Sequence, residues 1–117
     1  MHKYEDLLVY QKALVYTKTV RTTLKKFPAE ELYGLTSQFR RAADSIVLNI
    51  TEGAGNYSNK EFGKFLMYSL RSGFECKGCI AIAATNDYVD SKLEQQLLND
   101  TNEIIAMLDG LYKSLNN

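Results

Sequence analysis

The sequence has one proline, one histidine, two cysteines and no tryptophan. So little proline excludes a proline-rich stalk, and two cysteines are too few for a disulfide-stabilised scaffold. No run of residues approaches the roughly 18 apolar positions that a membrane-spanning helix needs. The first residues, Met-His-Lys-Tyr-Glu-Asp, lack the layout of a secretory signal peptide. We therefore expect a cytoplasmic protein with no membrane partner.

The chain contains enough apolar material for one folded domain over residues 1–117. Of its 117 residues, 45% are hydrophobic and 24% are charged, which excludes an intrinsically disordered chain. Basic and acidic residues number 14 each, but residues 1–86 hold twelve basic and eight acidic residues, whereas residues 87–117 hold two and six. One part of the chain is therefore basic and the other acidic. This asymmetry suits the binding of phosphate groups or of a second copy of the chain.

Apolar residues recur at three- and four-residue steps in four segments, residues 9–27, 32–50, 62–83 and 97–115. This spacing lines up one face of a helix. No stretch of comparable length alternates polar and apolar residues as a half-buried strand would. The connections between the segments are short, which favours antiparallel neighbours. We predict an all-α fold, an antiparallel up-down-up-down four-helix bundle.

Residues that stop or start helices lie between these segments. Pro28 cannot continue a helix from its interior, but it suits the first turn of a new one. Ser58 with Glu61, and Ser91 with Glu94, have the spacing of a capping box. Their hydroxyl groups can therefore accept hydrogen bonds from free backbone N–H groups at two helix starts. These signals place the starts of the third and fourth helices at Ser58 and Ser91.

Five glycines affect the second and third helices. Gly53 and Gly55 interrupt the second apolar pattern, and we interpret them as residues that end the helix. Gly34 leaves the start of that helix open, because it can separate a short turn from the main helix. Gly73 and Gly78 lie inside the third segment, where each costs about 1 kcal/mol relative to alanine. We expect close packing against a neighbouring helix to offset that cost.

Two helices carry a second apolar line in addition to the line that faces the core. A four-helix bundle buries one stripe per helix, so these residues need another surface to cover them. We predict a homo-oligomer that assembles through them. The alternative is that a wide core stripe covers part of them, because single exposed apolar residues are common. The residues are Leu7, Tyr10 and Leu14 in the first helix and Met67, Leu70 and Phe74 in the third.

His2, Cys76 and Cys79 are the residues that could carry nucleophilic or metal chemistry. His2 belongs to a terminus that we expect to be mobile, which leaves no anchored general base. Cys76 and Cys79 match C-x-x-C, but they lie within a helical segment, and tetrahedral zinc would need two more ligands. We interpret both as thiols of the core or of an interface. The sequence predicts no catalytic residue, metal site or cofactor, and a thiol- or metal-dependent enzyme is the weakest alternative.

Basic residues form stripes on the predicted helix surfaces, where they could follow a phosphate backbone. Charge on an exposed face is also the ordinary device for solubility, so spacing alone leaves both interpretations open. The candidate nucleic-acid-binding residues are Lys18, Arg21 and Lys25 in the first helix, Arg40 and Arg41 in the second, and Lys60, Lys64 and Arg71 in the third.

The second helix also has a polar line at residues 41, 45, 49 and 52. It ends in Glu52, whose negative charge is unfavourable near a helix C-terminus. We expect Glu52 to have a cationic partner, either Arg41 or a residue of another subunit. The alternative is an ordinary solvated face.

Two blocks of sequence, residues 6–13 (DLLVYQKA) and 33–43 (YGLTSQFRRAA), are followed by shorter pairs: Ser45-Ile46, Asn49-Ile50, Glu52-Gly53, Glu61-Phe62 and Phe65-Leu66. In this order and spacing they resemble the bacterial four-helix-bundle proteins encoded by 23S ribosomal RNA intervening sequences, over almost the whole chain. The same fold is similar to the accessory protein of diversity-generating retroelements, a basic homopentameric barrel that works beside a reverse transcriptase. The resemblance implies a non-enzymatic, pentameric bundle associated with RNA or ribosomal RNA.

The chain departs from that family at a few positions. Tyr10 stands where members usually have tryptophan, and Val47-Leu48 stand where they have Pro-Ser, so we expect no kink in the second helix. Together with the basic stripes, the resemblance predicts an RNA-associated adaptor. A homopentamer is the favoured assembly, and a reverse transcriptase is a partner by family analogy. The rival hypothesis is a structural or protein-interaction module without nucleic acid.

Overall fold

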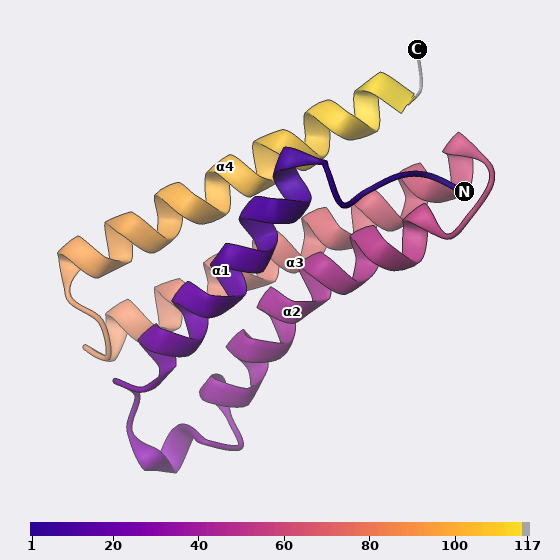
Figure 1. Cartoon of the computed structure of the whole chain (residues 1–117). Helices are drawn as coiled ribbons and strands as arrows, with labels where there is room; N and C mark the ends of the chain where they lie inside the picture. Colours follow the sequence, from indigo (N-terminus) through magenta and orange to yellow (C-terminus); the bar gives the residue numbers. More distant parts are fainter. Residues whose placement is uncertain (116–117) are drawn as a thin grey trace.

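Four helices make up most of the chain in the computed structural model, which describes residues 1–115. They are α1 (Leu8–Leu24), α2 (Leu35–Ala54), α3 (Asn59–Thr85) and α4 (Ser91–Leu115), with one 3₁₀ turn, η1 (Ala29–Glu31), before α2. Successive helices run in opposite directions (Figure 1), and residues 1–115 contain no strand. This confirms the all-α four-helix prediction. Residues 116 and 117, which we counted in the expected domain, lie outside the described part.

The helices pack in a ring of neighbours. The contact between α2 and α3 is the most extensive, followed by α3 with α4 and α1 with α2, whereas α1 and α4 touch least. Within the described chain, α1 makes no close backbone approach to α3, and α2 makes none to α4. These two pairs therefore lie across the diagonals of the bundle. The outward faces of α1 and α3 point to opposite sides of the molecule.

Most residues that the apolar periodicity singles out are buried, but Leu32, at the start of the second apolar segment, keeps 50% of its surface exposed, so its predicted burial is wrong. Phe39 and Ile46 of α2, Leu66 of α3 and Leu108 of α4 have no exposed surface. One polar pair also lies inside: the Tyr16 hydroxyl is 2.6 Å from the Thr101 hydroxyl, which donates in turn to the Leu97 carbonyl oxygen at 2.7 Å. A buried hydroxyl group without a hydrogen-bond partner is costly. These two hydrogen bonds satisfy both hydroxyl groups inside the core.

One of the two predicted helix caps is confirmed and the other is shifted. The Ser58 hydroxyl oxygen accepts from the Glu61 backbone N–H at 3.1 Å at the start of α3. At the start of α4, the Asp90 carboxylate accepts from the Leu93 N–H at 2.8 Å. The expected cap at Ser91 is therefore wrong by one residue. An aspartate accepts this bond as well as a serine and adds a negative charge at the positive end of the helix.

The segment between α1 and α2 explains the ambiguity at Gly34. Pro28 directly precedes η1, and Gly34 separates that turn from α2. The Glu31 carboxylate then accepts from the Leu35 N–H at 3.2 Å, so a side chain from η1 satisfies one of the free amides at the start of α2. The short turn and the main helix are two elements, linked by this hydrogen bond.

Some of the glycines have the expected role and others do not. Gly55 is the C-cap of α2, which confirms that it ends the helix. Gly53 does not end α2, which continues to Ala54. A β-carbon on Gly53 would lie 2.5 Å from the β-carbon of Phe65, so this glycine lets α2 and α3 approach closely. A β-carbon on Gly73 would lie 2.8 Å from Ile105, which confirms the expected close packing there. Gly78 has no neighbouring atom within 4 Å of that position, so for Gly78 the packing prediction is wrong.

The amino-terminal segment is fixed in place, contrary to our expectation of a mobile end. The His2 backbone N–H donates to the Ala54 carbonyl oxygen at 2.8 Å, and its ring Nδ1 donates to the Asn56 carbonyl oxygen at 2.9 Å. Nε2 lies 2.9 Å from the Asn59 side-chain oxygen, and the ring packs on Phe62 with 4.5 Å between ring centres. Both ring nitrogens therefore hold the terminus against the connection between α2 and α3.

Candidate nucleic-acid interface

Three of the predicted basic residues share one exposed edge of α3. Lys60, Lys64 and Arg71 follow one another at four- and seven-residue steps, so they project from the same side of the helix. All three are exposed, and no ion pair between residues 1 and 115 involves them. The Arg71 guanidinium carbon lies 5.9 Å from the centre of the Tyr68 ring, a cation–π contact. These three residues, the α3 basic edge, present their charge to solvent.

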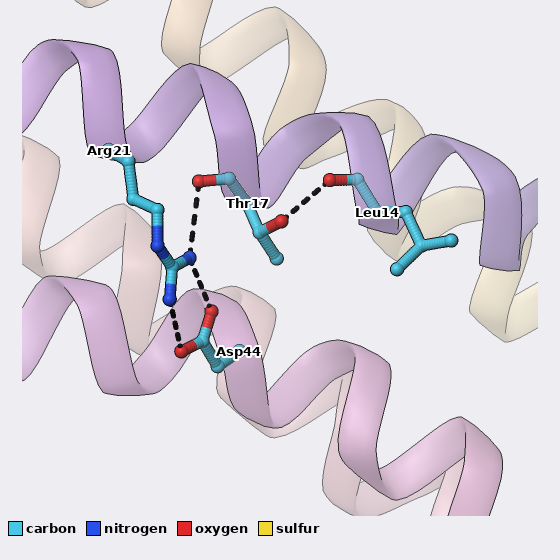
Figure 2. A network of polar contacts seen from close by, with 4 residues as sticks. All are labelled: Leu14, Thr17, Arg21 and Asp44. Carbon is cyan, nitrogen blue, oxygen red and sulfur yellow. Dashed lines mark hydrogen bonds and ion pairs between the residues drawn. The ribbon is translucent and has the colours of Figure 1, made fainter.

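In α1 one of the predicted residues is already paired. Figure 2 shows Arg21 reaching Asp44 of α2: Nη1 donates to Oδ1 at 2.7 Å and Nη2 donates to Oδ2 at 2.9 Å. Nη1 also approaches the Thr17 carbonyl oxygen at 3.4 Å, and the Thr17 hydroxyl donates to the Leu14 carbonyl oxygen at 2.6 Å. The hydrogen bond to Asp44 raises the pKa of Arg21. Arg21 therefore links two helices, and its charge is balanced within the chain.

The other two basic residues of the first stripe lie far from the α3 basic edge. Lys18 is exposed on α1, and Lys25 is exposed directly after the end of that helix. Because α1 and α3 lie across a diagonal, the two stripes face opposite sides of the bundle. A straight duplex cannot contact both stripes of one protomer. The structure therefore separates the predicted residues into two surfaces.

Arg40 and Arg41 are consecutive in sequence but differ in their surroundings. Successive helical residues project about 100° apart, and only Arg41 lines a cleft between α2 and α3. Arg41 is exposed and has no hydrogen-bond or ion-pair partner in the described part of the chain. It is therefore the basic residue of α2 best placed to meet a ligand on the α3 side.

This α2–α3 polar cleft has a volume of about 510 Å³. The side-chain amide of Gln38 donates to the Glu75 carboxylate at 3.4 Å across it, and the Ser72 hydroxyl donates to the Ser45 hydroxyl at 2.9 Å. Sequence reasoning missed the cleft, because Glu75 comes from another helix and nothing in its spacing relates it to α2. The available signal was the density of polar residues in block 33–43. The cleft is lined by Tyr33, Gly34, Ser37, Gln38, Arg41, Ala42, Ser45 and Glu75.

The polar line of α2 is satisfied locally, without the expected ion pair. The Asn49 side-chain amide donates to both the carbonyl and the hydroxyl oxygen of Ser45 at 2.9 Å. Glu52 forms no ion pair with any described residue, and Arg41 is three helical turns away, about 16 Å along the axis. The expected partnership between Glu52 and Arg41 is therefore wrong.

The predicted second apolar lines are only partly exposed. Leu7, Tyr10 and Leu70 pack partly against the core, as the alternative interpretation allows. Met67 is also half-buried, whereas Leu14 and Phe74 keep 43% and 54% of their surface exposed. Within the four helices, four more apolar residues keep 51% to 65% of their surface exposed, and the predicted lines missed them: Leu8, Val15, Leu48 and Ile82.

An apolar groove runs between α1 and α4, where the helices touch least. It has a volume of about 400 Å³ and is lined in part by Leu8, Val15 and Ile104. The exposed fractions of Leu8 and Val15 are 58% and 65%, which is high for aliphatic side chains that line one groove. Lys12 and Glu103 form an ion pair across it. The α1–α4 groove is therefore an apolar surface with a charged rim.

The two thiols are buried, as the sequence predicts. Cys76 has no exposed surface and Cys79 has 3%. Burial raises the pKa of Cys76 to about 12 and that of Cys79 to about 11. Because the thiolate is the reactive form, these side chains are poor nucleophiles in the folded state. No cluster of three or more metal-ligating side chains occurs within residues 1–115.

Comparison with known proteins places the fold in a family. None of the described helices is long and apolar enough to cross a membrane. The model of the 23S rRNA-intervening sequence protein family matches residues 5–110, and the chain belongs to that family of four-helix bundles. A comparison with curated proteins found no match.

A solved structure has the same fold. It is a protein of unknown function from the S23 ribosomal protein family of Bacteroides thetaiotaomicron, with 22% sequence identity and a TM-score of 0.84. The alignment covers 91% of this chain and 99% of that one. At this identity the likeness concerns the arrangement of the helices.

Proposed function

We propose that this chain is a non-enzymatic, RNA-associated adaptor that works as a homo-oligomer. The observation that carries the RNA part is a set of four exposed cations without an acidic partner: Arg41 and the α3 basic edge. No internal ion pair has to be broken before these residues meet phosphates, and binding releases the counterions of the RNA. The family name, which refers to 23S rRNA, agrees with this choice of ligand.

The distribution of charge favours one side of the bundle for the RNA. α4 carries four acidic residues, Glu94, Asp100, Glu103 and Asp109, and only two basic ones. RNA is therefore repelled from α4 and attracted to the face formed by α2 and α3. Lys18 and Lys25, on the opposite side, belong to a second contact surface that a different RNA segment, or a second protomer's RNA, would use.

A titration across salt concentrations tests this proposal. A labelled, structured fragment of ribosomal RNA is titrated with the wild-type chain and with the triple variant Lys60→Ala, Lys64→Ala, Arg71→Ala. We expect the variant to bind at least about tenfold more weakly at low salt and to show a smaller salt slope, by about 2 to 3, because three phosphate contacts are lost. The control is the double variant Lys92→Ala, Lys113→Ala on α4, which should bind like the wild type. Absence of binding at low salt, or equal binding by the triple variant, refutes the proposal.

The exposed apolar residues support the oligomeric part. Leu14 of α1 and Phe74 of α3 lie on helices that face opposite sides of the bundle. A two-fold dimer would cover one of these surfaces and leave the other exposed, whereas head-to-tail docking covers both and can close into a ring. We propose a ring of this kind, with five subunits as the family resemblance suggests. Size-exclusion chromatography with light scattering tests it: the wild type should exceed the mass of one chain, and Phe74→Ser should reduce that mass. A monomeric wild type at micromolar concentration contradicts the proposal.

Burial of the two thiols, which raises their pKa values, argues against a thiol-dependent enzyme. A protein-interaction module without nucleic acid is the second candidate, because the α1–α4 groove exposes Leu8 and Val15. The two candidates separate in the experiments above. An oligomer that binds no RNA at low salt supports the module, and salt-dependent RNA binding supports the adaptor.

A further inference from the structure

Block 33–43, which carries much of the family resemblance, divides between two environments. Its apolar members, among them Leu35 and Phe39, are buried in the core. Its polar members Ser37, Gln38 and Arg41 line the α2–α3 polar cleft together with Tyr33. Packing therefore explains only half of the block. Tyr33, Ser37, Gln38 and Arg41 lie together along the cleft, which Arg40 does not line.

Tyr33 is the most exposed large side chain at this cleft. Its exposed fraction is 93%, so almost nothing in the chain covers its ring. A tyrosine ring that is neither buried nor packed contributes little to stability, but it offers a flat surface on which a nucleic-acid base can stack. Its position at the rim places such a base against the polar wall of the cleft.

That wall presents a hydrogen-bond donor beside acceptors. The Gln38 side-chain amide and the Glu75 carboxylate are joined by a hydrogen bond of 3.4 Å, which is long and weak enough to be exchanged for a ligand. Glu75 accepts hydrogen bonds, and the Gln38 amide can donate them. The Watson–Crick edge of guanine has the matching order, the acceptor O6 followed by the donors N1–H and N2–H. Uracil, cytosine and adenine each place an acceptor where guanine has a donor facing the carboxylate.

Cations beside this wall fit the phosphates of the same nucleotide and its neighbour. Arg41 lines the cleft and has an unpaired guanidinium group among the described residues, with donors arranged to bind phosphate oxygens. Arg71 lies four residues before Glu75, about one helical turn along α3. The α3 basic edge continues from Arg71 to Lys64 and Lys60. The volume of about 510 Å³ falls within the range of sites that hold molecules of nucleotide size.

We infer that the α2–α3 polar cleft binds one unpaired guanine nucleotide of an RNA loop or single strand. The base stacks on Tyr33, its edge bonds to Gln38 and Glu75, and Arg41 binds its phosphate. This inference rests on the proposed RNA association and names the ligand of one part of that surface. A base must leave its helix to be read in this way, so the target is single-stranded RNA.

The test uses three labelled RNAs that share one stem: a hairpin with a guanine-containing loop, a hairpin with an all-uracil loop, and a blunt duplex without a loop. Affinities are measured by fluorescence anisotropy on the full chain. We expect the guanine loop to bind at least about fivefold more tightly than the uracil loop. Tyr33→Ala should lose at least about fivefold on the guanine loop and less than about twofold on the duplex, because one stacked base is lost. Tyr33→Phe should retain the affinity, and the exposed Tyr57, at the other end of α2, supplies the control Tyr57→Ala.

Glu75→Gln gives the sharpest outcome, because two explanations predict opposite changes in the affinity for the guanine loop. Removal of a negative charge beside phosphates should strengthen binding to every RNA if the carboxylate acts only through its charge. If Glu75 reads guanine, the variant should weaken binding to the guanine loop by about tenfold while binding to the uracil loop is unchanged or stronger. Circular dichroism and light scattering verify that each variant keeps its fold and assembly.

The failure of this inference and the failure of the proposed function have different results. Binding that depends on Lys60, Lys64 and Arg71, but neither on the loop base nor on Tyr33, refutes the guanine site and leaves the RNA proposal standing. No binding of any hairpin at low salt refutes both. A change of oligomer mass in Tyr33→Ala or Arg41→Ala, without a loss of guanine preference, shows that the cleft is a protein contact and also refutes the guanine site.

Discussion

The substitution Gly53→Ala tests how closely α2 and α3 pack. An alanine β-carbon at this position would lie 2.5 Å from the β-carbon of Phe65 and 3.1 Å from a ring carbon of Phe62. Non-bonded carbons are comfortable at about 3.5 to 4 Å, so the overlap with Phe65 is about 1 Å or more. The β-carbon of Phe65 is attached to the α3 backbone and cannot rotate away. The helices would therefore have to move apart along their most extensive contact.

The expected magnitude follows from two opposing terms. Replacing a helical glycine with alanine gains at most about 1 kcal/mol of helix propensity. Forcing an extra carbon into a packed interface costs about 1 to 3 kcal/mol, and the upper part of that range applies because both colliding atoms belong to helix backbones or to their first side-chain atom. We expect Gly53→Ala to lower the free energy of unfolding by about 1 to 2 kcal/mol, which corresponds to a fall in Tm of roughly 3 to 8 °C in a domain of this size.

Two other helical glycines supply matched controls. A β-carbon at Gly78 or at Gly110 meets no atom within 4 Å, so Gly78→Ala and Gly110→Ala have the propensity gain without the collision. Each should raise the free energy of unfolding by about 0.5 to 1 kcal/mol. Urea denaturation followed by circular dichroism at 222 nm measures all three variants. If Gly53→Ala is as stable as the wild type, or shifts in the same direction as the controls, the close approach described for α2 and α3 is incorrect. If a partner subunit covers Gly78 or Gly110, the alanine variant at that position should change the mass of the oligomer measured by light scattering.

Two further substitutions and the two buried thiols also have calculable outcomes. His2→Ala should lower the free energy of unfolding by about 1 kcal/mol, since two side-chain hydrogen bonds, one of them exposed, and a ring contact are lost, and hydrogen exchange at the start of the chain should accelerate. Asp44→Ala removes the partly exposed ion pair with Arg21. Urea denaturation should show that the free energy of unfolding falls by about 0.5 kcal/mol in dilute buffer and by less in 1 M salt. Cys76 and Cys79 should not react with a thiol reagent at about pH 8 until the chain is unfolded. Their pKa values in the folded state lie above the ordinary 9.0, so the unfolded chain loses these protons first, and stability should fall as the pH rises above about 9.

The apolar periodicity predicted the core because burial in a bundle depends on position around each helix, and that position follows from residue number. Val9, Ala13 and Phe39 are buried for this reason. The cap at Ser58 was also predictable, because the hydroxyl group and the amide that it accepts from lie three residues apart. Such local relations need no knowledge of the neighbouring helix.

Features that depend on the neighbouring helix could not be predicted in this way. Gly53 was interpreted as a helix breaker, because its real partner, Phe65, belongs to another helix. The separation of the basic stripes onto opposite sides needed the ring order of the helices, which periodicity does not specify. The pairing of Arg21 with Asp44 likewise depends on how α1 and α2 are aligned. The candidate site is therefore predictable as a set of residue types, but its surfaces are defined only by the packing of the helices.

The same packing explains why a cleft exists beside the closest contact of the bundle. Near Gly53 the α2–α3 interface has no side chain on one helix, and farther along the small hydroxyl groups of Ser45 and Ser72 meet. Still farther, about 22 Å along α2 from Gly53, the interface consists of the long side chains Gln38 and Glu75. The side chains that meet across the interface are thus longer toward the start of α2, where the polar cleft lies. The closest backbone approach and the polar cleft therefore lie at opposite ends of the α2–α3 interface.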